Sequence, residues 1–296
     1  MNVHKSVLNK EAIESLEIKK NKVYIDATLN GGGHTEEILK SGGKVLGIDL
    51  DGKAIRQAAA KFDLTLHEGE KLSAEGKNIT IIQGNFANLR EIAKSCGVWE
   101  TPGVLFDLGL SSNQLEDPER GFSFTKNGPL DMRMDTSLQV TAADLINSLS
   151  ERELHELFSR YGEEHSSRRI ARAIVNTRIK NKIKSTRDLV TLIESVVRGR
   201  GRIHPATRVF QALRIAVNSE LENLKKGLDE AVSILNHGGK VVVISFHSLE
   251  DRIVKEFFKN DARLRVISKK PIVPTETEIN SNPRSRSAKM RVAEKI

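Results

Sequence analysis

Four short, almost entirely apolar runs recur through the first part of the chain, at residues 23–25, 45–48, 79–82 and 104–106. Apolar runs without alternation are typical of strands that are covered on both faces of a sheet. Segments with helical patterning lie between these runs, at residues 35–40, 53–61 and 89–94. Strands that alternate with helices in this way predict an α/β fold with a parallel, Rossmann-like sheet.

A fifth run of the same kind, residues 241–246, follows only after a further stretch of about 130 residues. A compact sheet does not carry a structureless connection of that length, so we expect a separate helical domain between the fourth and fifth strands. We expect residues 1–112 and 209–296 to form the sheet domain. Residues 113–208 would then form the inserted domain.

Helix signals support the inserted domain. Ser150 and Glu153 form a capping-box pattern, and the residues behind them repeat the spacing of a buried helical face. Pro205 suits the first turn of a helix, and apolar residues continue on one face as far as Leu224, which predicts one long helix. Near the end of the chain, residues 264–268 and 289–293 resemble strands, and we expect an antiparallel pair that closes the sheet.

Positive charge is concentrated in one segment. The whole chain of 296 residues carries a formal net charge of +8. Residues 168–208 alone contain twelve Lys and Arg against Asp188 and Glu194, which makes that segment +10 and the rest of the chain −2. A solvated helical face would explain the excess, but its confinement to one region favours a surface that binds phosphates.

Other features exclude several classes of protein. Cys96 is the one cysteine, so the chain has no internal disulfide and no zinc site built from cysteine pairs. We expect no metal. The sequence contains no apolar stretch long enough to span a membrane and no apolar core of a signal peptide, so we expect a cytoplasmic protein.

A glycine-rich turn follows the first predicted strand, which ends at Asp26. The turn contains Gly31, Gly32 and Gly33 and runs into His34. Consecutive glycines let the backbone turn sharply and approach a ligand closely. In open α/β sheets, ligands bind at this carboxyl end of the strands.

The next two predicted strands supply further candidates. Asp49 ends the second strand, where a carboxylate can accept hydrogen bonds from both hydroxyls of a ribose. Phe86 follows the third strand and could stack on an adenine, although a core phenylalanine is the alternative. These features indicate a cofactor that carries a nucleoside. They fit NAD as well as S-adenosylmethionine, but the run Gly-Gly-Gly-His differs from the Gly-x-Gly-x-x-Gly pattern of NAD sites.

Long motifs follow the fourth strand, and with them the chain resembles the bacterial 16S ribosomal RNA (cytosine-N4)-methyltransferases, the RsmH/MraW family. The resemblance covers essentially the whole sequence, from His4 onward. Its motifs lie at residues 107–115, 120–124, 128–135, 160–171, 204–212, 244–252 and 282–287. Departures are mild: Asn30 and Asn113 replace residues that are commoner in relatives, and residues 68–77 look like a polar insertion.

The resemblance implies a class I S-adenosylmethionine-dependent methyltransferase. The expected reaction transfers a methyl group to the N4 amine of a cytidine in 16S ribosomal RNA, in the decoding region of the small subunit. The family's cofactor contacts correspond to seven residues here: Gly32, Gly33, His34, Asp49, Phe86, Asp107 and Gln114. Candidate contacts to the RNA are Arg133, Arg168, Arg169, Arg172, His204 and Ser248.

The catalytic group is less defined by the sequence. The cytosine amine is a poor nucleophile, so an acceptor for its hydrogens would assist the transfer. The (Asp/Asn)-Pro-Pro-aromatic motif of many amino methyltransferases is absent, because the matching position begins with Asp107 and Leu108. Asp107 is a candidate for this role, although we favour cofactor binding for it. Asp131 and His247 are further candidates, with a self-paired loop and a structural histidine as the respective alternatives.

Methylation at carbon C5 of cytosine would require a cysteine nucleophile. Cys96 precedes the fourth strand and lies outside any Pro-Cys motif, so the residues favour N-methylation independently of the resemblance. Two other functions stay open: a nicotinamide-dependent oxidoreductase and a non-catalytic RNA-binding assembly factor. The sequence also leaves the oligomeric state open, with a homodimer as one option.

Overall fold

The computed structural model describes residues 6–69, 71–197 and 204–296. His4 and three basic residues of the charged segment, Arg198, Arg200 and Arg202, lie outside these ranges. The chain divides into two compact units. The first comprises Met1–Ser111 and Leu221–Ile296, and the second comprises Ser112–Glu220.

In the described part of the chain, nine strands form one sheet in the order β3-β4-β5-β2-β1-β6-β7-β9-β8, all within the first unit. Their bounds are β1 Val23–Asp26, β2 Lys44–Asp49, β3 Thr65–His67, β4 Ser73–Gly76, β5 Ile79–Gln83, β6 Thr101–Asp107, β7 Leu235–Ser245, β8 Leu264–Val266 and β9 Lys289–Lys295. The central strands β5, β2, β1, β6 and β7 pair in parallel. The predicted α/β fold with a parallel sheet is therefore confirmed.

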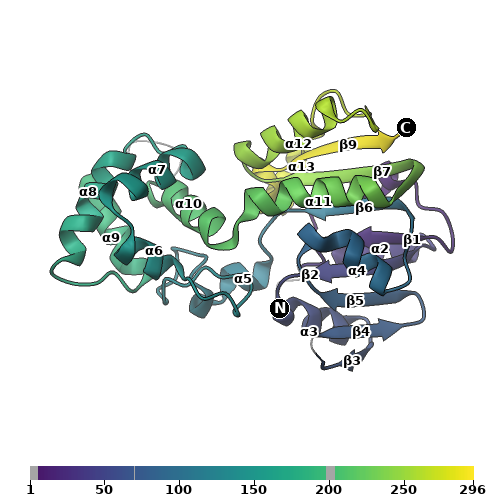
Figure 1. Cartoon of the computed structure of the whole chain (residues 1–296), viewed down its shortest axis with the longest axis horizontal. Helices are drawn as coiled ribbons and strands as arrows, with labels where there is room; N and C mark the ends of the chain where they lie inside the picture. Colours follow the sequence, from purple (N-terminus) through teal and green to yellow (C-terminus); the bar gives the residue numbers. More distant parts are fainter. Residues whose placement is uncertain (1–5, 70, 198–203) are drawn as a thin grey trace. The chain divides into compact units, whose positions relative to one another are not determined.

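Helices cover both faces of this sheet, which explains why its strands are apolar throughout. One core cluster contains Tyr24, Val45 and Leu105 and packs against α1 Asn9–Leu16, α2 Gly33–Lys40 and α3 Gly52–Lys61. The other contains the alternate residues Ile25, Leu46 and Phe106 and packs against α4 Leu89–Ser95, α11 Glu220–Ile234 and α12 Ser248–Asn260. Figure 1 shows α4 and α11 on the near face of the sheet. The side chains of successive residues in a strand thus point to opposite faces of the sheet and pack in different core clusters.

The carboxyl-terminal strands complete the sheet as expected. β9 pairs in antiparallel fashion with both β7 and β8. The short helix α13 Glu276–Ser281 and the 3-10 turn Pro283–Ser287 lie in the connection between β8 and β9.

The segment that looks like a polar insertion in the sequence contains β4, which pairs in antiparallel fashion with β3 and with β5 and so extends the sheet. Exposed edge strands need little apolar patterning. All three residues of β3 are exposed, and Ala74 is the one buried residue of β4. The sequence therefore carries almost no strand signal here.

The second unit is helical. Its elements are α5 Ser112–Glu116, the 3-10 turn Pro118–Arg120, α6 Ala142–Ser148, α7 Glu151–Gly162, α8 Ser167–Arg178, α9 Thr186–Val196 and α10 Ala206–Asn218. The predicted capping box is present, since the Ser150 hydroxyl accepts from the Glu153 amide and the Glu153 carboxylate accepts from the Ser150 amide. Among the described residues, no helix has the length and apolar character needed to cross a membrane.

The prediction of one long helix from Pro205 to Leu224 is wrong. α10 ends at Asn218, Ser219 adopts a left-handed conformation with φ 50°, and α11 starts at Glu220. The Asn218 side chain is buried and bonds the Met132 carbonyl and the Met134 amide. α10 packs against α6, α7 and α9, so the second unit extends to Glu220, whereas the sequence placed the return to the sheet domain at residue 209.

Candidate active site

Three buried or partly buried carboxylates end neighbouring strands of the sheet. Asp26 ends β1, Asp49 ends β2 and Asp107 ends β6. β1 lies between β2 and β6 and runs parallel to both, with Asp26 in register with Gly47 and Leu105. All three side chains therefore gather at the carboxyl edge of the sheet, where a ligand is expected.

Strained backbone joins β1 to α2 above these carboxylates. Asn30 has φ 48° and Gly32 has φ 65°, both in the left-handed region that favours glycine. A Cβ at Gly32 would lie 2.8 Å from the Phe62 ring. Lys61 donates to the carbonyls of Gly31 and Gly32 at 3.1 and 3.3 Å. Gly32 is thus required by its φ and by the Phe62 ring, in addition to any closeness to a ligand.

The first turn of α2 is covered by the amino-terminal segment of the described chain. A Cβ at Gly33 would lie 2.0 Å from the Ser6 hydroxyl. His34 is buried, and its Nε2 lies 3.1 Å from the Val7 carbonyl oxygen. Because a carbonyl only accepts, Nε2 donates this hydrogen bond, and Nδ1 on the other side of the ring lies 3.7 Å from Oδ2 of Asp107. His34 therefore links the amino-terminal segment to the carboxylate of β6.

Burial raises the pKa of each of the three carboxyl groups. The pKa of Asp26 rises to about 6, although hydrogen bonds from Thr35 and from the Thr28 amide oppose the shift. The pKa values of Asp49 and Asp107 both rise to about 7. Buried carboxyl groups with pKa values near neutrality are characteristic of functional sites. A ligand that donates hydrogen bonds to them would favour their charged forms.

The surroundings of Asp49 fit a ribose. Its Oδ2 accepts the Asn30 amide at 2.8 Å and its Oδ1 accepts the Asp51 amide at 2.9 Å, which fixes the orientation of the carboxylate. A carboxylate offers about four acceptor positions, so about two are left for further donors. The side chain is partly exposed at the end of β2. Two vicinal hydroxyls of a nucleoside match this donor requirement.

Phe86 follows β5 and is partly buried. Its ring meets Phe106 edge to face, with centroids 5.5 Å apart. A Cβ at Gly227 of α11 would lie 2.6 Å from the Phe86 ring. The ring therefore packs in the core below α11, and adenine stacking would use only its exposed part.

The remaining cofactor candidate, Gln114, lies on α5 in the second unit and is 8% exposed.

Asn30, a departure from the family pattern, connects two of the carboxylate residues. Its backbone amide bonds Asp49, and its side-chain amide donates to the Asp107 carbonyl at 3.2 Å. Asn30 therefore ties the turn after β1 to the ends of β2 and β6.

His247 has a structural role at the start of α12, just beyond β7. Its Nδ1 accepts the Glu250 amide at 3.3 Å, as part of a capping box. The Glu250 carboxylate, 2% exposed, accepts the Phe246 and His247 amides. His247 Nε2 lies 3.0 Å from Glu250 Oε1. Ser248 is the first residue of α12.

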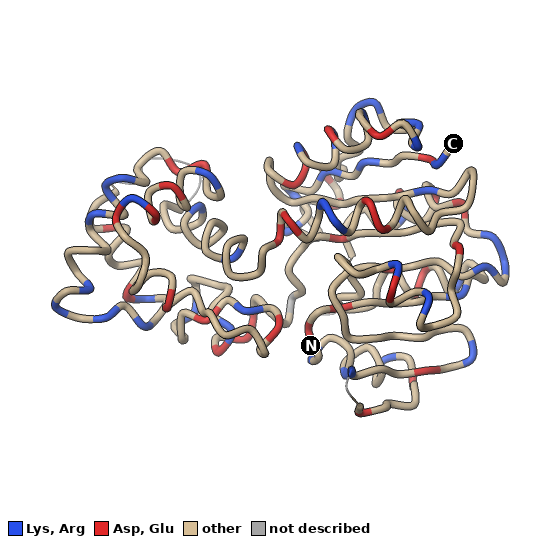
Figure 2. The backbone as a smooth tube through the Cα atoms, in the orientation of Figure 1, with Lys and Arg blue, Asp and Glu red and all other residues tan. Residues whose placement is uncertain are grey.

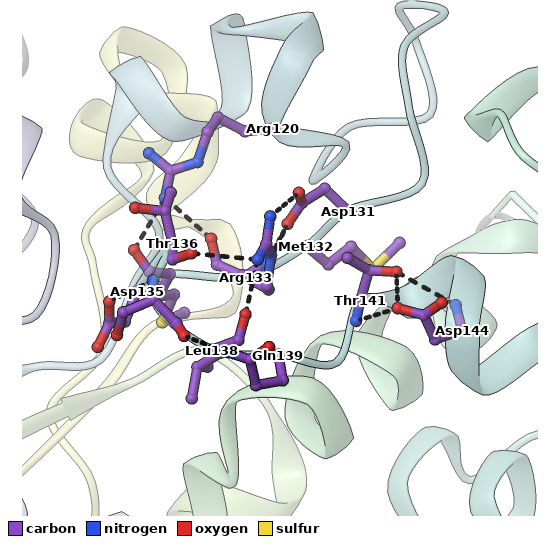
Figure 3. A network of polar contacts seen from close by, with 12 residues as sticks. Arg120, Asp131, Met132, Arg133, Asp135, Thr136, Leu138, Gln139, Thr141 and Asp144 are labelled. Carbon is purple, nitrogen blue, oxygen red and sulfur yellow. Dashed lines mark hydrogen bonds and ion pairs between the residues drawn. The ribbon is translucent and has the colours of Figure 1, made fainter.

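Asp131 and Arg133 form a closed polar network in the second unit, drawn in Figure 3. Arg133 donates to both carboxylate oxygens of Asp131, at 2.9 and 2.8 Å, and to the carbonyls of Thr136 and Leu138. Burial alone would raise the pKa of Asp131, but the hydrogen bonds from Arg133 outweigh it and lower that pKa. Arg120, 5% exposed, holds the Arg133 carbonyl at 3.0 Å. This geometry matches the structural alternative for both residues.

The other RNA candidates also belong to the second unit. Arg168, Arg169 and Arg172 lie on α8 with exposed side chains, and Arg172 makes a 3.4 Å contact with Glu151. His204 stacks on Phe124, with centroids 4.7 Å apart, and its Nε2 lies 3.1 Å from a Glu194 oxygen. In Figure 2, Lys and Arg positions recur along the helices of this unit.

Sequence reasoning gave Asp26 no role in the site, although it noted that the residue ends the first strand. In the structure Asp26 lies between Asp49 and Asp107, and its carboxylate accepts the Thr35 hydroxyl at 2.7 Å. The position of Asp26 at the end of an apolar strand was the signal in the sequence that could have placed it in the site. Nothing in the sequence indicated that Thr35, on the buried side of α2, would bond to it.

Comparison with known proteins identifies the family of the chain. The model of the MraW methylase family matches residues 1–296. The chain is 47% identical to Ribosomal RNA small subunit methyltransferase H of Dehalococcoides mccartyi, over 99% of this chain and 86% of that relative. It is 46% identical to the protein of the same name from Carboxydothermus hydrogenoformans, over 99% and 98%. The relative of this name in Clostridioides difficile is 42% identical, over 99% of each. The chain therefore belongs to the MraW methylase family.

Proposed function

We propose that this protein transfers the methyl group of S-adenosylmethionine to the N4 amine of a cytidine in 16S ribosomal RNA. The observation that carries the proposal is the group of strand-end carboxylates, with acceptor positions left on Asp49, in a chain of this methylase family. The curated relatives are named as methyltransferases of small-subunit ribosomal RNA. We place the target in the decoding region of the small subunit and the reaction in the cytoplasm.

The chain's own residues bind and orient the cofactor. Asp49 accepts the ribose hydroxyls, and the backbone of Gly32 and Gly33 faces the amino-acid part. His34 and Asp107 lie beside each other at the end of β6, and together with Phe86 and Gln114 they are the further cofactor contacts that we propose. S-adenosylmethionine, when bound, supplies an electrophilic methyl group, so alignment of that group with the amine is the main task of the protein.

Asp107 is the residue that we assign to the amine as well as to the cofactor. Its pKa of about 7 lets the carboxylate take a proton near neutral pH. Asp131 already accepts two hydrogen bonds from Arg133, and His247 caps α12. We therefore assign positioning roles to Asp131 and His247.

The second unit is the proposed RNA-recognition domain. Exposed guanidinium groups on one helix suit phosphates, because each can donate two parallel hydrogen bonds. Arg168, Arg169 and Arg172 supply three such groups on α8. His204 and Arg133 are further RNA contacts that we propose in this unit, and Ser248 is a proposed RNA contact of the sheet unit. Sedimentation of the purified protein would decide whether two copies pair.

Methyl transfer tests the proposal. Small subunits from cells that lack the protein are incubated with enzyme and labelled S-adenosylmethionine, and their nucleosides are identified by mass spectrometry. We expect label in N4-methylcytidine. Asp49→Asn should abolish most of the transfer, whereas Glu91→Gln, the same chemical change at an exposed residue of α4, should not. Label in 5-methylcytidine, or no label with the wild-type protein, would refute the proposal.

A separate measurement tests the RNA surface. Reversing the charge at Arg168, Arg169 and Arg172 should weaken RNA binding and leave cofactor affinity unchanged. Each lost phosphate contact lowers the slope of log Kd against log salt by about 0.7 to 0.9. RNA affinity equal to that of the wild type would contradict the role of α8.

A further inference from the structure

A row of lysines lies at the amino edge of the sheet, away from the carboxylates described above. These lysines begin or precede three strands that are neighbours in the sheet. They are Lys19, Lys20 and Lys22 before β1, Lys44 at the start of β2, and Lys77 before β5. Lys44 is partly exposed and the other four are exposed. In Figure 2, Lys and Arg positions gather at this edge of the sheet. We call these five residues the lysine edge.

Strand register brings the lysine edge together. Val23 of β1 is paired with Lys44, and the Lys44 amide donates to the Lys22 carbonyl at 2.8 Å. Val45 of β2 is paired with Ile79, two residues beyond Lys77. Because these strands are parallel, their starting loops lie side by side. Five positive charges thus occupy one short stretch of surface.

The loop before β1 is held in place. The Tyr24 hydroxyl accepts the Lys19 amide at 2.8 Å and donates to the Glu17 carbonyl at 3.3 Å. The Asn21 amide donates to the Gly42 carbonyl at 2.8 Å. A fixed loop presents its lysines in one arrangement, which lowers the entropic cost of binding a partner.

The five lysines of the lysine edge form no ion pairs with any residue that the structure describes. Lysines elsewhere in this unit form ion pairs, as Lys61 does with Glu36 and Lys240 with Glu294. Within the described ranges, no carboxylate lies at ion-pair distance from any of the five lysines. Glu17, next to the row in sequence, pairs with Lys240 at 3.3 Å. The unneutralised charge favours a polyanion as the partner.

An exposed aromatic residue stands beside this row. Trp99 is 67% exposed and precedes β6, the strand next to β1 on the other side. The Thr101 hydroxyl donates to the Val23 carbonyl at 2.7 Å and ties the starts of β6 and β1 together. The ammonium of Lys94 lies 5.4 Å from the Trp99 ring centroid. Exposed tryptophan with flanking lysines suits stacked bases and their phosphates.

We propose that the lysine edge and Trp99 form a second RNA-binding site, which takes a single-stranded segment with phosphates on the lysines and an unpaired base on the indole. The inference rests on the proposed function, because ribosomal RNA supplies the ligand. β6 has seven residues from Thr101 to Asp107, so about 20 Å separates this site from the carboxylate edge. The site therefore binds RNA remote from the target cytidine and anchors the enzyme on its substrate.

Trp99 allows a direct test, because it is the one tryptophan in the chain. The probe is a single-stranded RNA of about 12 nucleotides, titrated against the full-length protein while tryptophan fluorescence is recorded. We expect saturable quenching that weakens with salt. An unchanged tryptophan signal at saturating RNA would overturn the proposal.

Charge-reversal variants then separate the site from general electrostatics. Lys19→Glu, Lys20→Glu and Lys22→Glu together should weaken binding of the probe at least tenfold and lower the salt slope by about 2. The control triple Lys255→Glu, Lys259→Glu and Lys269→Glu carries the same charge change on exposed lysines elsewhere in the unit and should weaken binding by less than about twofold. Equal losses in the two triples would contradict a local site.

Trp99→Leu tests the stacking contact. Measured by anisotropy of labelled RNA, this variant should lose about fivefold or more in affinity. Binding of methylthioadenosine should be the same in all variants, which separates a failure of this inference from a failure of the cofactor site. Wild-type RNA affinity in Trp99→Leu would refute base stacking.

Discussion

Nucleoside binding should depend on pH through Asp49. Burial raises the pKa of this carboxyl group to about 7, and only its charged form accepts hydrogen bonds from both ribose hydroxyls with both oxygens. A ligand that binds the charged form becomes tighter as the pH rises through that pKa. The affinity should therefore increase between about pH 6 and pH 8 and level off above.

The size of the effect follows from the titration of one group. With a pKa of about 7, about 9% of Asp49 is charged at pH 6 and about 91% at pH 8. The dissociation constant should then fall about tenfold over this interval, which corresponds to about 1.4 kcal/mol. Asp26 and Asp107 titrate in the same range, so a variant is needed to isolate Asp49.

Isothermal titration calorimetry with methylthioadenosine measures this directly. This ligand keeps the adenine and the ribose but lacks the titrating amino-acid groups of the full cofactor. Asp49→Asn should bind more weakly at pH 8 and should lose most of the pH dependence. A wild-type dissociation constant that is the same at pH 6 and pH 8, or an equal pH dependence in Asp49→Asn, would refute the assignment of Asp49 to the ribose.

Three further predictions concern stability. The folded-state pKa of Asp107 lies above its unfolded value, so the folded protein binds more protons than the unfolded chain. The free energy of unfolding should therefore fall as the pH rises from about 4 to about 7. Asp107→Asn should reduce this dependence on pH, measured by denaturant titration. Gly32→Ala should lower the free energy of unfolding by about 1–2 kcal/mol because of the left-handed φ, and by about 1–3 kcal/mol more because the new Cβ clashes with the Phe62 ring. Gly97→Ala, at φ 74° with open space around it, should show only the first of these losses. Arg133→Leu should lower stability by about 2 kcal/mol or more and leave methylthioadenosine affinity unchanged; unaltered thermal unfolding would contradict the structural assignment of that loop.

The sheet was predictable because its strands are buried on both faces. Full burial leaves continuous apolar runs in the sequence, and each such run lies within or overlaps a strand. The bounds of β1, β2 and β5 differ from the runs by at most one residue at either end, whereas β6 and β7 begin three and six residues earlier than predicted. The β3–β4 hairpin was not predicted because β3, the edge strand, is fully exposed and β4 has one buried residue, so neither carries such a pattern. The sequence did not predict the break between α10 and α11, because the spacing of apolar residues continues through it. Ser219 interrupts the helix only through its backbone conformation.

The candidate site was predictable in part for a similar reason. Asp49 and Asp107 end apolar strands, and topology alone brings such ends together. The sequence revealed only part of the reason for a glycine at position 32, because the Phe62 ring that lies against it comes from the residue that follows α3. The capping role of His247 was not visible either, since it depends on a buried Glu250. Contacts between distant segments carry no local signal.

A crystal structure of the protein with S-adenosylhomocysteine would locate the cofactor relative to the strand-end carboxylates. We expect the adenosine at the ends of β1 and β2, with both ribose hydroxyl oxygens within about 3 Å of the Asp49 carboxylate. The sulfur should lie on the side of the crevice near Asp107. Ligand bound elsewhere on the sheet, or a crevice between Gly32 and Asp49 filled by side chains while the ligand is bound, would contradict this placement.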